Sequence, residues 1–141
     1  MPTSFTFSND RALIDRDLVH RWLSEESYWA KGRSRATQDA AIDASRNYSI
    51  RDDADRQVGY ARVVTDGVTF AWLCDVFVDE RARGHGIGRM LVEGVLEDLR
   101  ESSTVKRIML ATSTAGGLYA QYGFAPSADP DHYMVKLIDR G

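Results

Sequence analysis

The sequence predicts an α/β fold, with a mixed, mostly antiparallel twisted sheet flanked by about four helices. Two observations carry this prediction: runs of helical period alternate with short β-type runs, and the β-type runs gather in the middle of the chain. The length of 141 residues suits one core, and no repeat, low-complexity tract or linker divides the chain. We therefore expect a single domain spanning residues 1–141.

The first third of the chain predicts two helices. After a short alternating start at Phe5 and Phe7, apolar residues recur at helical spacing and predict an amphipathic helix over Ile14–Ser24. A second, alanine-rich helix is predicted over Arg35–Ser45, with Ser34 placed to cap its N-terminus.

The middle of the chain predicts an antiparallel meander. Its β-type runs are Tyr48–Arg51, Gln57–Val64 and Val68–Val78. Asp66-Gly67 between two β-branched runs is a typical hairpin turn.

The last third predicts helix, strand, helix and strand in turn. A long helix over Gly86–Arg100 has apolar residues at steps of three and four. It is followed by a buried strand at Val105–Ala111, a short helix at Gly117–Tyr122 and a closing strand at Tyr133–Ile138.

Composition narrows the class of protein. Hydrophobic residues make up 43% and charged residues 28%, as in soluble globular domains, and a formal charge of -3 makes nucleic acid a poor partner. The one cysteine, Cys74, cannot form an intramolecular disulfide, and the start lacks the build of a secretory signal. The longest apolar run, Val68–Cys74, is far shorter than the roughly 20 residues of a membrane span, so we expect a cytoplasmic protein with no membrane partner.

The segment Asp75–Arg89 has the architecture of an anion site. A strand leads through Gly84, Gly86 and Gly88 into a helix, whose first N–H groups and dipole attract negative charge. The alternative is a tight connection in which the glycines serve packing alone. A dinucleotide fingerprint fails because Arg89 stands where the third glycine belongs, and no P-loop Gly-Lys-Ser/Thr occurs.

The segment does match R/Q-x-x-G-x-G/A, in the overlapping frames Arg81–Gly86 and Arg83–Gly88. With a preceding apolar strand and the later run Leu118–Phe124, a tyrosine-bearing helix followed by Gly-Phe, the chain resembles the GNAT superfamily of acetyl-CoA-dependent N-acetyltransferases. The resemblance covers nearly the whole chain and implies acetyl-CoA as co-substrate, its pyrophosphate held by the loop. The residues it assigns to the coenzyme are Val76, Phe77, Val78, Arg83, Gly84, His85, Gly86, Ile87, Gly88, Arg89 and Tyr122.

Acetyl transfer requires a stabilised oxyanion and a proton for the departing thiolate. The resemblance implies a splayed strand before the loop, where the backbone N–H of Phe77 or Val78 would bind the oxyanion. Tyr119 is the predicted acid, because a phenol of pKa about 10 is neutral at pH 7 and can protonate a thiolate. Its alternative role is that of a half-buried aromatic residue with a hydrogen-bonded hydroxyl.

Asp75 is the leading candidate for the base or for binding the amine, because it interrupts an apolar strand just before the expected coenzyme edge. Structural hydrogen bonding is an equal alternative. Cys74 alternates to the opposite strand face in this prediction, and we interpret it as a small buried apolar residue rather than a nucleophile.

The acceptor side is less well marked. Tyr28 and Trp29 lie between the first two helices and could form a substrate wall for a cationic amine, or pack between the helices. Asp66 belongs to the hairpin turn but could reach the mouth of the site. His20, His85 and His132 show neither paired spacing nor clustered thiolates, so no metal is expected.

The sequence therefore predicts an N-acetyltransferase that moves an acetyl group from acetyl-CoA to a primary amine by direct attack, through a tetrahedral intermediate. The alternative is a CoA-binding sensor or scaffold of the same fold without significant catalysis. A nucleotide-binding regulator is a third class, weakened by the failed phosphate motifs. The expected acceptor is a small-molecule or peptide amine, and the sequence leaves a homodimer open.

Overall fold

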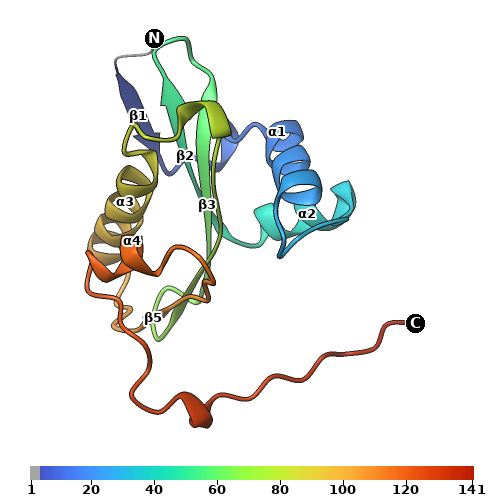
Figure 1. The fold of residues 1–141 in the computed structure, drawn as a ribbon, viewed down its shortest axis with the longest axis vertical. Coiled ribbons are helices and arrows are strands. Elements are labelled where there is room, and N and C mark those ends of the chain that lie inside the picture. The colour runs from blue at the N-terminus through green and yellow to red at the C-terminus, as the bar shows by residue number, and fades with distance from the viewer. Residues whose placement is uncertain (1–3) are drawn as a thin grey trace.

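The computed structural model describes residues 4–141 and contains one five-stranded sheet, in the order β1-β2-β3-β4-β5 (Figure 1). Strands β1 to β4 pair antiparallel, and β5 pairs parallel with β4. The strands are β1 (Phe5–Ser8), β2 (Arg46–Asp52), β3 (Gln57–Thr65), β4 (Ala71–Val78) and β5 (Ile108–Met109). The predicted fold class, a mixed and mostly antiparallel sheet, is confirmed.

Helices lie on both faces of the sheet, α1 and α2 on one and α3 on the other (Figure 1). They are α1 (Arg16–Arg21), α2 (Arg35–Asp43), α3 (Ile87–Ser102) and α4 (Gly116–Ala120). The first predicted helix is displaced by two residues: Asp15 caps α1, and after Arg21 the helix continues as a π-helical turn over Trp22–Glu26. Ser34 caps α2 as predicted, accepting a bond from the Thr37 N–H at 3.1 Å.

Two glycines let α3 approach the sheet. A Cβ on Gly59 of β3 would lie 2.8 Å from Ile87, and one on Gly94 would lie 2.3 Å from the Phe7 ring. The α3 face of the sheet is thus a close-packed core, which fixes the start of α3 relative to β4. Within the described residues, none of the helices has the length and apolarity needed to cross a bilayer.

The hairpin between β3 and β4 forms, but its loop is longer than an Asp-Gly turn. Thr65 pairs with Ala71, so five residues separate the strands. The Asp66 carboxylate accepts bonds from the Val68 and Thr69 N–H groups, both at 2.8 Å, and these bonds hold the chain in a wider loop. The strand predicted to begin at Val68 therefore begins at Ala71.

A β-bulge interrupts β4 at Asp75, whose φ of +51° is unusual for a residue other than glycine. Arg62 pairs with Cys74 and Tyr60 with Phe77, so two residues of β4 oppose one of β3. The extra residue disturbs the alternation of faces. Asp75 bonds to Arg62, the partner of Cys74, so Cys74 and Asp75 face the same side, and the predicted opposite placement is wrong.

The C-terminal part differs most from the prediction. Of the predicted strand Val105–Ala111 only β5 forms, and Tyr133–Ile138 forms no strand. After a 3-10 turn at Pro130–His132 the chain runs away from the body of the molecule (Figure 1). A strand needs a neighbour for its backbone N–H and C=O groups, and this segment has none within the described chain.

Candidate active site

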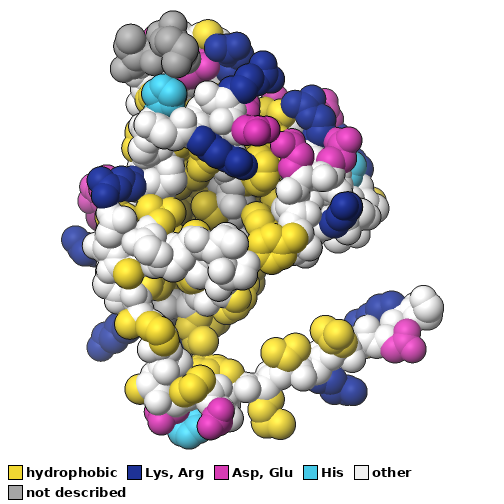
Figure 2. Space-filling model, viewed as in Figure 1, with side chains coloured by type: hydrophobic (Ala, Val, Ile, Leu, Met, Phe, Trp, Pro, Cys, Tyr) yellow, Lys and Arg dark blue, Asp and Glu magenta, His cyan; other side chains and the backbone are white. Residues whose placement is uncertain are grey.

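Strands β4 and β5 separate in the middle of the sheet. They pair only at Ala71–Ile108 and Trp72–Met109, after which β5 leaves toward α4 (Figure 1). The surface is hollowed between α4 and the α1–α2 side, with hydrophobic side chains on its floor (Figure 2). The second half of β4 therefore has one backbone edge that faces this cleft.

Strand alternation identifies the free donors of that edge. The Asp79 N–H donates to the Val58 carbonyl of β3 at 2.9 Å, and Phe77 is paired with Tyr60. Because successive N–H groups point to opposite edges, that of Val78 points to the edge that β5 has left. Of the two predicted oxyanion donors, Val78 has the suitable orientation and Phe77 faces β3.

The glycine-rich loop lies at the end of β4 and leads into α3. Gly84 and Gly86 have φ values of +87° and +76°, and Gly86 is the N-cap of α3 without a side-chain cap. The first N–H of the helix with a backbone acceptor is that of Met90, which donates to the Gly86 carbonyl at 3.1 Å. No acceptor within residues 4–141 is recorded for the N–H groups of residues 84–89.

This loop fits a diphosphate. No atom lies within 4 Å of the position of a Cβ on Gly84 or Gly86, so the backbone is open to a ligand. Several convergent N–H groups and the positive end of the sixteen-residue α3 favour an anion there. The residues present thus suit the pyrophosphate of coenzyme A.

The side chains of the loop hold its shape. The Arg83 guanidinium lies 5.8 Å from the centre of the Phe77 ring, and the His85 Nδ1 lies 3.1 Å from the Ala82 carbonyl oxygen. Arg89 donates to Gln121 at the end of α4. The His85 ring is thus engaged within its own loop, which leaves the backbone N–H as the group available to a ligand.

Tyr119 lies on α4 at the edge of the cleft and is 8% exposed. Its ring packs edge-on against Phe124, held by the turn at Gly123 with its φ of +88°. Burial raises the pKa of Tyr119, and the neighbouring Tyr28 raises it further, so the phenol is protonated at neutral pH. Within the described chain its hydroxyl has no recorded hydrogen-bond partner, which leaves it free to donate.

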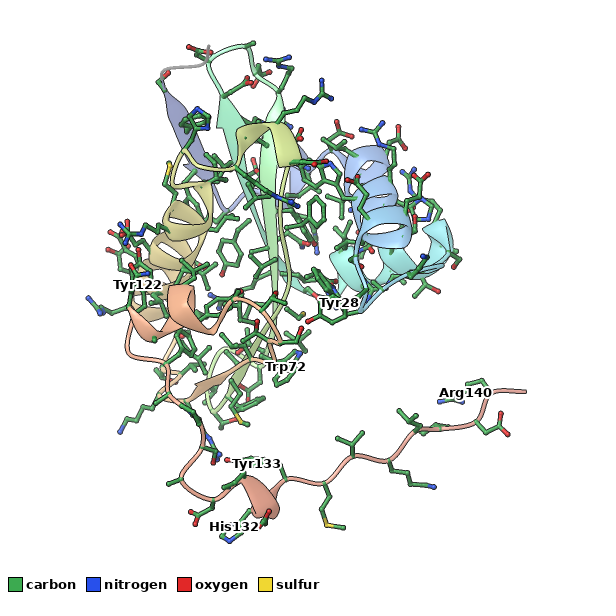
Figure 3. The ribbon with its side chains drawn as sticks, viewed as in Figure 1. Tyr28, Trp72, Tyr122, His132, Tyr133 and Arg140 are labelled. Carbon is green, nitrogen blue, oxygen red and sulfur yellow. The ribbon has the colours of Figure 1, made fainter. Side chains whose placement is uncertain are left out.

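Tyr122 lies on the α3 side of α4 (Figure 3). Its hydroxyl donates to Glu93 at 2.8 Å. The structure therefore places this predicted coenzyme contact on the outer side of α4, and its role toward the coenzyme stays a prediction.

The Asp75 carboxylate is buried and fully engaged. One oxygen accepts from the Trp29 indole N–H at 2.9 Å, and the other accepts from Arg33 at 2.8 Å and from Arg62 at 2.9 Å. The side chain is 2% exposed. These contacts correspond to the structural alternative for Asp75.

The electrostatics of Asp75 argue against a base. Burial alone would raise its pKa, but the hydrogen bond from Arg33 and the charge of Arg62 outweigh burial and hold the pKa below its ordinary value. A general base works best with a pKa near the working pH. An ionised carboxylate bound by two guanidinium groups is therefore poorly suited to accept a proton from an amine.

Tyr28 lies at the side of the cleft opposite α4 (Figure 3), and Trp29 follows it in the α1–α2 connection. Their rings pack edge to face with centres 5.1 Å apart, and Tyr28 is 65% exposed. Ser113, in the connection from β5 to α4, donates to the Tyr28 hydroxyl at 2.8 Å. The predicted acceptor wall and the predicted acid Tyr119 thus meet across the cleft.

Asp66 is not brought to this cleft. It lies in the hairpin before Ala71, whereas the glycine loop follows Val78 at the other end of β4. Its carboxylate accepts from Thr69 and from neighbouring N–H groups, and these bonds lower its pKa. Its contacts are those of a turn residue.

Other candidate groups add no chemistry to the cleft. Burial raises the pKa of the Cys74 thiol to about 11, which keeps it protonated. Among the described residues no group of three potential metal ligands occurs. A cavity of about 470 Å³ beside the loop includes Arg81 and His85, but neither Tyr119 nor the open edge of β4, so it is not the reactive centre.

Three residues of the site were missed from the sequence: Arg33, Arg62 and Ser113. Arg62 interrupts the apolar run of β3 as Asp75 interrupts β4, and this pair of interruptions was a usable signal. A two-residue Asp-Gly turn would place Arg62 opposite Ala71, far from Asp75. In the structure the longer hairpin loop and the β-bulge change this register and bring Arg62 to Asp75, so the sequence did not reveal the pair. Nothing local marks Arg33 or Ser113.

Comparisons with known proteins agree with this geometry. The sequence profile of the Acetyltransferase (GNAT) family matches residues 16–124. A solved protein of the GNAT family from Xanthomonas campestris pv. campestris is 39% identical, with a TM-score of 0.89 over 98% of this chain and 96% of its own.

Two further relatives bear on chemistry. Serotonin N-acetyltransferase 2, chloroplastic, of Oryza sativa subsp. japonica is 36% identical over 83 residues, which are 59% of this chain and 40% of that protein. Rv2747 of Mycobacterium tuberculosis, solved in complex with CoA, is 18% identical with a TM-score of 0.69 over 85% of this chain and 71% of its own, and shows a shared fold.

Proposed function

The chain belongs to the GNAT acetyltransferase family, and from that premise we propose that it acetylates a primary amine by direct transfer from acetyl-CoA. The amine nitrogen attacks the thioester carbonyl carbon, a tetrahedral intermediate forms, and the carbon–sulfur bond then breaks. The departing thiolate takes up a proton, and the amine loses one. The products are an amide and free coenzyme A.

In this proposal the glycine loop binds the coenzyme and the open edge of β4 stabilises the intermediate. The N–H groups between Arg83 and Arg89 bind the diphosphate, and this fixes the coenzyme along the open edge of β4. The Val78 N–H, which points to that edge, stabilises the negative oxygen of the intermediate. The observation that carries the proposal is the run of N–H groups at residues 84–89 that have no acceptor within the described chain.

Tyr119 supplies the proton to the thiolate. Its position on α4, its raised pKa and its unengaged hydroxyl support this role. The amine lies against Tyr28 and Trp29, whose ring faces suit a cationic or aromatic acceptor.

Asp75 acts as a positioning residue in this proposal rather than as the base. It holds the Trp29 indole and the Arg33 guanidinium, and so ties the α1–α2 loop to β4. The acceptor wall depends on this tie, because Tyr28 and Trp29 belong to that loop.

The test is a titration with acetyl-CoA by calorimetry, followed by an assay of free thiol with polyamines, amino acids, aminoglycosides, arylalkylamines and lysine peptides. We expect binding of acetyl-CoA and thiol release that requires one class of amine. Binding without turnover on any amine would favour the sensor or scaffold. Binding of ATP or NAD by a protein that does not bind acetyl-CoA would contradict the proposal altogether.

A further inference from the structure

A cavity of about 470 Å³ lies at the end of the sheet where β2 turns into β3 and where β4 leads into the glycine loop. Its walls come from β1, α1, the β2–β3 turn and the 3-10 turn after β4. The first three of these lie at the upper end of the view in Figure 1. A hollow of this volume is large enough for a small organic molecule, and the proposed function gives it no task.

The cavity and the reactive cleft lie on opposite sides of β4. The cleft opens on the side that β5 has left, whereas the cavity is lined by residues of β2 and β3. Tyr28 and Tyr119 do not line it, but Arg81 and His85 at the start of the glycine loop do. An occupant would therefore be a second ligand, in contact with the loop but outside the path of the acetyl group.

Two arginine side chains of the cavity wall have no recorded partner. Within the described residues no ion pair or hydrogen bond is recorded for the guanidinium groups of Arg21, at the end of α1, and Arg81, in the turn after β4. Both residues are exposed, so an anion can reach them from solvent. Guanidinium groups bind carboxylates and phosphates through paired N–H groups, which makes these two side chains suitable partners for an anion.

The wall also contains two buried donors without an acceptor. Within residues 4–141 four buried side-chain atoms have no recorded hydrogen-bond partner, and two of them, Arg51 Nε and Gln57 Nε2, belong to residues that line this cavity. The Gln57 Oε1 accepts from the Asp15 N–H at 2.9 Å, and this bond sets the orientation of the amide. A buried polar group without a partner lowers stability. Since both groups are donors, the partner that would satisfy them is an acceptor.

The carboxylates of the wall already have donors. Asp52 accepts from two backbone N–H groups, both at 2.9 Å, and from the Arg56 Nε at 3.2 Å. Asp15 and Asp79 accept from backbone N–H groups in the first turn of α1 and in the turn after β4. Asp55 lies 3.7 Å from an arginine of β2. Because each acid is engaged while two guanidinium groups are not, an anion fits this wall better than a cation.

The rest of the wall is apolar. Phe5, Leu18, Val58 and Ala82 line the cavity from β1, α1, β3 and the turn after β4. An inorganic anion would leave this surface uncovered. A molecule with an apolar body and an anionic group would cover it and still reach the two guanidinium groups.

We propose that this cavity binds a small organic anion, a carboxylate or phosphate monoester with an apolar body, at a site separate from that of the coenzyme. Arg21 and Arg81 bind the anionic group, and the apolar residues cover the body. Oxygen atoms of the ligand accept from Arg51 Nε and Gln57 Nε2. Because the ligand touches the start of the glycine loop, its binding and that of CoA are able to influence each other.

The test follows the full chain by ¹H–¹⁵N NMR while phenyl phosphate, phenylacetate or hexanoate is added, with and without saturating CoA. We expect saturable shifts of the backbone amides at residues 51–58 and 79–85 and of the Arg51 Nε and Gln57 Nε2 signals, in both conditions. The tighter of the phosphate and the carboxylates identifies the anionic group. Benzyl alcohol, which has a ring but no charge, and inorganic phosphate, which has no apolar body, should bind at least about tenfold more weakly.

The double variant Arg21→Gln, Arg81→Gln tests the two guanidinium groups. We expect its affinity for the organic anion to fall by about a hundredfold, roughly tenfold for each lost charge-assisted bond, while CoA binds as in the wild type. Arg100→Gln, Arg107→Gln is the matched control, because it makes the same charge change at two exposed residues that do not line the cavity. The control should bind the anion normally, and equal melting temperatures of the two variants show that both are folded.

Three results would overturn the proposal. The first is the lack of saturable binding of any of the three organic anions. The second is displacement of the anion by CoA, or shifts centred on α4, since the anion would then occupy the coenzyme site. The third is equally tight binding of benzyl alcohol, or of the anion by the double variant. Because the titration is also run without CoA, a failure of the protein to bind CoA is a separate result, which bears on the proposed function alone.

Discussion

The glycine loop and the Asp75 cluster are the two polar regions of the site, and they treat their polar groups in opposite ways. The loop presents backbone N–H groups at residues 84–89 with no recorded acceptor, whereas the Asp75 carboxylate accepts three bonds from side chains. A polar group left open at a surface is available to a ligand, and one that is buried and saturated maintains structure. We therefore expect substitutions in the glycine loop to weaken coenzyme binding. We expect substitutions in the Asp75 cluster to lower the stability of the fold.

The largest expected effect comes from Gly86→Val. At a φ of +76° a β-branched residue is strained, and its side chain would occupy the open space over the loop. Two lost charge-assisted bonds of about 1.5–3 kcal/mol each correspond to a roughly hundredfold to ten-thousandfold loss of affinity for CoA, measured by calorimetry. Gly67→Val, with a φ of +75° in the hairpin, is the control for strain and should bind CoA normally. Tight binding by Gly86→Val would mean that the loop is only a connection.

Tyr119→Phe tests the chemistry next to the loop. Without the phenol the thiolate must leave unprotonated, so we expect turnover to fall by roughly a hundredfold to a thousandfold while CoA binding is unchanged. Because burial and Tyr28 raise the Tyr119 pKa, the wild-type rate should not decline through ionisation of this group up to about pH 10. Tyr122→Phe removes only the bond to Glu93 and should keep the wild-type rate. An unchanged rate in Tyr119→Phe would remove the assignment.

Asp75→Asn tests the saturated region. It leaves Arg33 and Arg62 without a counter-charge, and we expect about 3 kcal/mol less stability to urea, near the low end for a broken buried ion pair because asparagine still accepts hydrogen bonds. The folded-state pKa of Asp75 is lowered, so its contribution is present above the unfolded pKa of about 3.9 and is lost as the pH falls through the folded value. The stability difference between wild type and variant should shrink over that range.

The pH profile of turnover separates the two roles of Asp75. A positioning residue changes the rate through the acceptor wall and leaves the shape of the profile intact. If the acidic limb of the profile moved in Asp75→Asn while the stability stayed unchanged, Asp75 would be the general base. Asp66→Asn, in the hairpin turn, is the control and should affect neither the profile nor amine binding.

The contrast between these regions also explains what the sequence could predict. The loop depends on neighbours in sequence, so its glycines, its helix and the tyrosine-bearing α4 were all visible in local patterns. The Asp75 cluster joins residues 13 to 46 positions apart, and its geometry depends on a bulge that shifts strand register by one residue. Such a shift has no local sequence signal, which is why Cys74 was assigned to the wrong face.

The C-terminal segment also shows a limit of prediction from local sequence patterns. The pattern of Tyr133–Ile138 does indicate a strand, but a pattern reports only what the segment prefers. Whether a strand forms depends on a partner edge, and after His132 this segment runs away from the body of the molecule (Figure 1). Local preference and tertiary placement thus disagree at this segment, as they do over most of Val105–Ala111, where only β5 forms.

The smallest expected effect comes from Tyr28→Phe, which removes one hydroxyl from the predicted acceptor wall. This hydroxyl accepts a bond from Ser113 and lies near Tyr119, while its ring packs against Trp29 in the loop that Asp75 holds. Because Tyr28 is largely exposed, the loss should be about 0.5–1 kcal/mol, seen as a twofold to fivefold rise in KM for the amine at nearly constant kcat. Ser113→Ala should give the same change, since it removes the other partner of the same bond. If Tyr28→Phe instead lowered kcat as strongly as Tyr119→Phe, the proton would reach the thiolate through Tyr28, and the acceptor wall would belong to the chemistry rather than to binding.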